Sequence, residues 1–192
     1  MTMRISIREP RAGDAEAHRA AVLRSDPHLR PWNPVEPDAL PELLRRQGAG
    51  LRTYLIVDDD DAAGNPDGAG GAGAARGTGG LVGTCNVANI VLGRFRNAAL
   101  GYDSYLPYAG TGRMTLGLRL VVDRCFRARP DGLGLHRLEI NVQPDNTRSL
   151  AMARRLGFRH EGFSPRMLFI NDAWRDHERF ALTAEEWQGP TA

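Results

Sequence analysis

Residues 102–128 read YDSYLPYAGTGRMTLGLRLVVDRCFRA. The first part is a strand-like run that ends at Pro107, and a glycine turn, Ala109–Arg113, leads from it into the next segment. From Met114 onward, apolar residues recur at i, i+4, i+7, i+8, i+11 and i+12. This spacing is the apolar stripe of an amphipathic helix. The stretch therefore predicts a strand, a glycine turn and a helix in direct succession.

Residues 135–158, LHRLEINVQPDNTRSLAMARRLGF, add a second strand and a second helix that ends at Gly157. A strand, a helix and a second strand form a right-handed crossover if the two strands are parallel. The unpaired amides at the start of the first helix would then converge on an anion held in the glycine turn.

The glycine turn taken alone does not identify a ligand. Thr115 stands where a dinucleotide-binding G-x-G-x-x-G pattern needs its third glycine, and no lysine follows as a P-loop requires. A tight turn that holds no ligand is therefore the alternative.

The two halves together resemble the GNAT superfamily of acyl-CoA-dependent N-acetyltransferases. Residues 135–162 and the tail SPRMLFINDAWRDHERFALTAEEW, at 164–187, are most similar to its ribosomal-protein-alanine branch, the RimJ/RimL type. The resemblance spans about residues 5–187 and is most specific at 110–162. It implies one α/β (α+β) domain over 1–192 with the GNAT acyl-CoA N-acyltransferase fold, a mixed central sheet flanked by helices.

The resemblance also implies a binding site for acetyl-CoA as co-substrate. Backbone amides of the turn would hold its pyrophosphate, and a polar pair after the second strand would meet the cofactor. Ala109 replaces the Gln or Arg of many relatives, and Met114 replaces a small residue. These two differences are expected to change the affinity for the cofactor more than the activity. An Asp or Asn before an apolar run also caps helices, so capping alone is the alternative for Asn146. The predicted cofactor-binding residues are Ala109, Gly110, Thr111, Gly112, Arg113, Met114, Asn146 and Ser149.

Two residues are predicted to be catalytic. Glu139 alternates with Leu138 and Ile140 on its strand and matches a glutamate that relatives use as general base. The alternative is a strand-surface Glu paired with an arginine. Many GNAT enzymes place a general-acid Tyr where this chain has Ala153, so Ser149 is the best-placed substitute.

The Pro-rich segment 26–37, DPHLRPWNPVEP, predicts a loop that carries Trp32. A Trp among prolines often forms a pocket wall. In relatives this loop joins two helices that flank splayed strands, so Trp32 is predicted to bind the acceptor substrate.

The rest of the chain supplies the remaining elements of the sheet. Helices are expected at 15–25 and 40–46, strands at 5–10, 53–59, 81–91 and 98–107, and a final hairpin joins 163–171 to 178–183. The Gly/Ala-rich stretch at about 58–80 has little to bury and is predicted to be a disordered insert between neighbouring strands.

Composition excludes several classes of protein. The net charge of +2 is small, which argues against a dedicated nucleic-acid binder. All the basic residues are Arg, which is a compositional bias and does not indicate a function. Two cysteines make neither a disulfide framework nor a metal site. The resemblance implies direct transfer in a ternary complex, so Cys85 is not expected to carry the acyl group. The first residues are not a signal peptide and no membrane span is apparent, so a soluble cytoplasmic protein is expected.

The function expected from the resemblance is acetyl transfer to a primary amine, foremost the α-amino group of a peptide or protein. The alternatives are an acetyltransferase for a small amine, such as an aminoglycoside or polyamine, and a CoA-binding regulator without catalysis. Neither a metal nor a nucleic-acid partner is expected, and a homodimer is left open.

Overall fold

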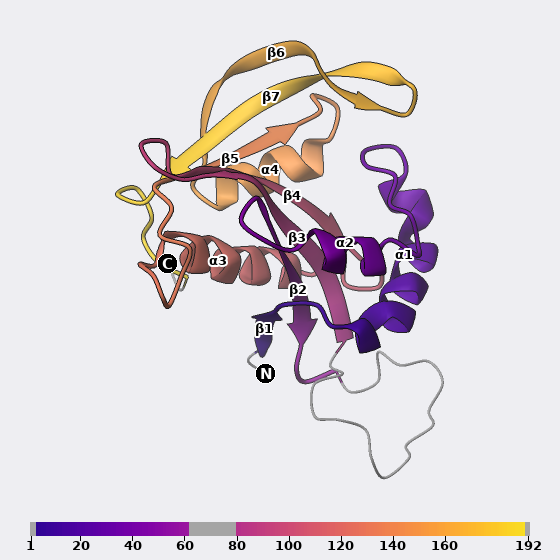
Figure 1. Ribbon diagram of the computed structural model, residues 1–192. Helices are drawn as coiled ribbons and strands as arrows, with labels where there is room; N and C mark the ends of the chain where they lie inside the picture. Colours follow the sequence, from indigo (N-terminus) through magenta and orange to yellow (C-terminus); the bar gives the residue numbers. More distant parts are fainter. Residues whose placement is uncertain (1–2, 62–79, 191–192) are drawn as a thin grey trace.

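The computed structural model describes residues 3–61 and 80–190, which form a seven-stranded sheet with helices on both faces (Figure 1). The elements follow one another in the predicted order, with a short 3-10 turn at Ala12–Asp14. They are β1 (Ile5–Arg8), α1 (Ala15–Leu29), α2 (Leu40–Arg46), β2 (Leu51–Asp58), β3 (Gly80–Val91), β4 (Asn97–Ser104), α3 (Arg113–Phe126), β5 (Arg137–Val142), α4 (Thr147–Arg155), β6 (Arg159–Ile170) and β7 (Ala173–Thr183).

The sheet has the strand order β1-β2-β3-β4-β5-β7-β6 and one parallel pair, β4 with β5. The crossover through α3 therefore joins parallel strands, as the sequence predicted. The parallel pairing is short, because it runs only from Asn97↔Arg137 to Ala99↔Glu139. Beyond it the two strands separate, so residues 100–104 of β4 have no partner on that side. This separation creates an opening in the middle of the sheet.

The main core lies between the sheet and the helices α3 and α4. Residues of the predicted apolar stripe of α3 are fully buried there, including Leu118, Val121 and Cys125. A smaller cluster on the opposite face packs Val22 and Leu29 of α1 against Tyr105. Successive residues of a strand point to opposite faces, so neighbours on β4 serve different sides of the sheet.

Helix α1 is longer than the sequence predicted. It continues through Pro27 to Leu29, whereas a loop was expected from residue 26. Leu29 is buried against Tyr105, and this packing offsets the hydrogen bond that Pro27 cannot donate. The expectation of a loop at 26–29 was therefore wrong, and the extra turn carries His28.

The predicted final hairpin is confirmed, with strands longer than expected. Its turn residues Asn171 and Asp172 have φ of 51° and 57°. Two consecutive residues with positive φ are typical of the type I′ turn, which Asn and Asp tolerate well.

The predicted insert falls mostly on residues 62–79, which lie outside those that the structure describes. Its flanks are part of the fold, because Asp58 ends β2 and pairs with Gly80 at the start of β3. The acidic run that follows makes specific contacts: the Ser6 hydroxyl donates to Asp59 at 2.9 Å and the Tyr108 hydroxyl to Asp61 at 2.5 Å. Within the described residues, no helix is long and apolar enough to cross a membrane.

Candidate active site

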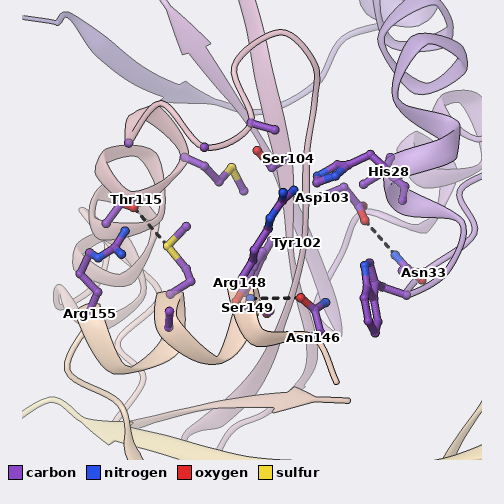
Figure 2. Close-up of a pocket in the computed structure, with 18 residues that line it drawn as sticks. His28, Asn33, Tyr102, Asp103, Ser104, Thr115, Asn146, Arg148, Ser149 and Arg155 are labelled. Atoms are coloured by element: carbon purple, nitrogen blue, oxygen red, sulfur yellow. Dashed lines mark hydrogen bonds between the residues drawn. The ribbon is translucent and has the colours of Figure 1, made fainter. Parts of the chain in front are cut away.

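A pocket of about 350 Å³ lies where β4 and β5 separate. Figure 2 shows residues from four parts of the fold around it: the end of α1 with its loop, the end of β4, the glycine turn with α3, and α4. Tyr102 and Asp103 are consecutive on β4, yet both line the pocket. The cavity therefore reaches both faces of the sheet around the free edge of this strand.

The glycine turn forms one wall of the pocket. Gly110 and Gly112 have φ of 82° and 87°, values that glycine adopts without strain, and Gly112 is the N-cap of α3. No atom lies within 4 Å of where a Cβ would stand at either residue. The first backbone N–H groups of a helix have no acceptor within it, so this wall presents donors to an anion. Four of the predicted cofactor residues line the pocket here: Ala109, Gly110, Gly112 and Met114.

The other two residues predicted in this turn do not line the pocket. The Thr111 hydroxyl donates to the carbonyl oxygen of Tyr108 at 2.6 Å. The guanidinium of Arg113 is ion-paired with the buried carboxylate of Asp58 and lies 5.6 Å from the centre of the Tyr108 ring. Arg113 was predicted to bind the cofactor, but its side chain is ion-paired with Asp58 and does not line the pocket. Arg148 and Arg155 line the pocket instead.

The start of α4 supplies the predicted polar pair. The side-chain oxygen of Asn146 accepts a hydrogen bond from the backbone N–H of Ser149 at 3.1 Å, so Asn146 caps the helix and also lines the pocket. The Ser149 hydroxyl is 2.7 Å from the phenol oxygen of Tyr102. Burial raises the pKa of Tyr102 to about 12, which keeps the phenol protonated at neutral pH. Two adjoining hydroxyls therefore face the pocket.

The opposite wall comes from α1, its loop and the other face of β4. Trp32 lines the pocket as predicted, and its carbonyl oxygen accepts a hydrogen bond from the Gln143 side chain at 2.9 Å. The amide of Asn33 donates to a carboxylate oxygen of Asp103 at 2.9 Å, a contact drawn in Figure 2. Burial raises the pKa of Asp103, while burial and the nearby Arg148 lower that of His28.

Glu139, the predicted general base, lies outside the pocket. Its neighbours Leu138 and Ile140 are buried on the opposite face of β5, as the alternation predicted, but Glu139 does not line the pocket. Its carboxylate accepts a hydrogen bond from the guanidinium of Arg137 at 2.9 Å. The geometry thus matches the alternative of a strand Glu paired with an arginine, and the catalytic role of Glu139 stays a prediction. Ala153 is fully buried in the core.

The pocket residues that sequence reasoning missed include three with titratable side chains: His28, Tyr102 and Asp103. His28 was missed because residues 26–37 were expected to form a loop, whereas His28 lies in the last turn of α1. Asp103 did give a signal, because it is the one charged residue in the strand-like run GYDSYL. Neither cysteine lines the pocket, and burial raises the pKa of both thiols, which disfavours a thiolate nucleophile at Cys85.

Comparison with known proteins identifies the family. The model of the acetyltransferase (GNAT) domain matches residues 4–159. The chain is similar to a probable N-acetyltransferase of Bacillus subtilis, YjcK, with 36% identity over 53% of this chain and 54% of the relative. It is also similar to the [ribosomal protein uS5]-alanine N-acetyltransferase of Escherichia coli, with 35% identity over 56% of this chain and 53% of the relative. These matches span about half the length of either relative.

A solved structure extends the similarity over nearly the whole chain. RimJ of Mycobacterium smegmatis, in complex with CoA-disulfide, superposes with a TM-score of 0.79 and 29% identity, covering 98% of this chain and 88% of the other. The fold is that of the GNAT acetyltransferases, as the sequence predicted. The chain belongs to the GNAT acetyltransferase family.

Proposed function

We propose that this chain transfers the acetyl group of acetyl-CoA to a primary amine, the N-terminal α-amino group of a peptide or protein. The observation that carries the proposal is a single pocket that reaches both faces of the sheet at the free edge of β4. A transfer between two substrates requires that the thioester and the amine meet in a fixed geometry. Two differently built walls around one opening suit that requirement.

The wall made by the glycine turn and α4 suits acetyl-CoA. Backbone N–H groups at the start of α3 would hold the pyrophosphate, because this helix end favours anions. Arg148 and Arg155 line the same pocket and supply positive charge for phosphate groups. The CoA-bound state of the similar RimJ structure supports this assignment.

The hydroxyl pair of Ser149 and Tyr102 suits the release of CoA. When the amine nitrogen attacks the acetyl carbonyl carbon, the C–S bond breaks and the thiolate must gain a proton. Ser149 is the proposed donor, and Tyr102, 2.7 Å away and protonated, can replace the proton that it gives. This pair provides a proton donor, which Ala153 does not provide at the position where many relatives have a tyrosine.

A peptide acceptor is supported by the similarity to the E. coli relative, which is a [ribosomal protein uS5]-alanine N-acetyltransferase. A polyamine carries several cationic nitrogens and needs several carboxylates, whereas the described lining residues include one, Asp103. The hydroxyl pair also argues against a regulator without catalysis.

The test is to follow thiol release from acetyl-CoA in the presence of peptides with free N-termini, the same peptides already N-acetylated, spermidine and an aminoglycoside. We expect thiol release with free N-termini only, and a product heavier by one acetyl group at the N-terminus. Turnover restricted to a small amine would support the second enzyme class. CoA binding without turnover on any amine would support the regulator.

A further inference from the structure

Asp103 is a buried carboxylate without a cationic partner. It is 5% exposed, and no arginine or histidine among the described residues is ion-paired with it. Its hydrogen-bond donors are neutral: the Asn33 amide at 2.9 Å and the Thr84 hydroxyl at 3.4 Å. Removing an anion from water costs several kcal/mol unless an opposite charge compensates it. Such a group suits a cation that arrives with a ligand.

The charged side chains that line the pocket come from different elements of the fold. Asp103 is the one carboxylate among the described lining residues, whereas Arg148 and Arg155 on α4 are cationic. In Figure 2, Asp103 lies with Asn33 on the side of α1, away from Thr115 and Arg155. Arg155 lies on the side suited to phosphates, whereas Arg148 is close enough to α1 to lower the pKa of His28. Among the described residues neither arginine is ion-paired with Asp103, which leaves Asp103 for a positive group on the acceptor side.

The carboxylate also has free acceptor capacity. Two carboxylate oxygens offer about four lone-pair positions, and the described donors occupy two of them, one through a long contact. The titratable groups around it are His28 and His18 from α1, Tyr105 directly after β4, Cys85 of β3, and Arg148 of α4. Burial lowers the pKa of both histidines and raises that of Tyr105, so these three stay neutral near pH 7.

We propose that Asp103 binds the ammonium group of the acceptor and accepts its proton, an inference that rests on the proposed transferase function. The ammonium gives one proton to a carboxylate oxygen and becomes a neutral amine. The nitrogen lone pair then forms a bond to the acetyl carbon, and the C–S bond breaks. Ser149 protonates the thiolate and regains a proton from Tyr102, which is reprotonated from water. The second proton of the nitrogen and, later, the proton on Asp103 are released to water, so that one proton is released in net for each acetyl group transferred.

Burial favours this role, because it raises the pKa of Asp103 toward that of the amine. The competing explanation is that Asp103 only anchors the Trp32 loop through Asn33. The substitution D103N separates the two, because an amide oxygen can still accept from Asn33 while the negative charge is lost. D38N is the matched control: Asp38 lies between α1 and α2, outside the pocket, and its ion pair with Arg19 is exposed.

The experiment measures kcat/KM for a peptide amine from pH 6 to 9, together with the dissociation constants of CoA and of the free and N-acetylated peptide. For D103N we expect a loss in kcat/KM of about 10²-fold at pH 7 that shrinks above pH 8, where free amine accumulates. The wild type should bind the free peptide more tightly than the acetylated one, and D103N should lose this preference with unchanged CoA affinity. D38N should match the wild type throughout.

The outcomes separate this inference from the proposed function. Wild-type turnover with an unaltered D103N profile would overturn the role of Asp103 and leave the transferase intact. A wild type that does not turn over but prefers the free amine through Asp103 would keep the inference and overturn the transferase. A loss in D103N that is constant with pH and matched by lower thermal stability would show a structural role only.

Discussion

The two walls of the pocket differ in how they are built. The wall of the glycine turn and α4 consists of local motifs, in which helix starts and caps orient each group through contacts a few residues apart. The wall of Trp32, Asn33 and Asp103 is assembled from a loop and a strand that are 70 residues apart in the chain. We infer that the first wall supplies the cofactor site and the second sets the acceptor.

The largest effect is expected at the hydroxyl pair that lies between the two walls. Ser149→Ala should lower kcat by about 10²-fold at every pH, because a hydroxyl does not titrate in the working range. Tyr102→Phe should act on the same step, so the double variant should lose less than the product of the single losses. Stopped thiol-release assays would measure all three. Fully multiplicative losses would show that the two hydroxyls act independently.

A substitution in the glycine turn should affect the cofactor wall alone. Gly112→Val places a β-branched residue at φ of 87°, a strain of about 1–3 kcal/mol that displaces the start of α3. We expect the Kd for CoA to rise about tenfold, with little change in acceptor binding. Gly93→Val is the control, because Gly93 also has positive φ and open space but lies outside the pocket. Unchanged CoA affinity in G112V would place the cofactor elsewhere.

A substitution at Trp32 should do the reverse. Trp32→Ala removes aromatic contacts worth about 0.5–1.5 kcal/mol, so the acceptor KM should rise about three- to tenfold while that for acetyl-CoA stays constant. Trp174→Ala provides the control, because Trp174 is 60% exposed on the β6–β7 hairpin and outside the pocket. An equal rise in both KM values, with lower thermal stability, would make Trp32 a structural residue.

The smallest effect is expected for the carboxylate that the sequence singled out. Because Glu139 is paired with Arg137 and does not line the pocket, E139Q should keep kcat/KM within about threefold, in line with the small energies of ion pairs that are partly exposed to solvent. The measurement is the pH profile used for D103N. A loss of about 10²-fold at pH 6.5 would restore Glu139 as the base and exclude that role for Asp103.

The sequence by itself determined the order of elements, the α3 stripe, the glycine turn and the family, because each depends on spacing along the chain or on short-range backbone geometry. It also singled out Asn146 and Ser149 as site residues, and both line the pocket. Their capping contact spans three residues. These interactions are local, so the pattern of residues is enough to predict them.

Only the tertiary structure decided which carboxylate meets the pocket and what Arg113 contacts. The first depends on where strands separate: β4 loses β5 as a partner after Ala99, so Tyr102 and Asp103 line the pocket while Glu139 stays within the paired region. Arg113 is fixed by Asp58, 55 residues earlier in the chain. Such contacts are set by the packing of distant segments, and no periodicity in the sequence encodes them.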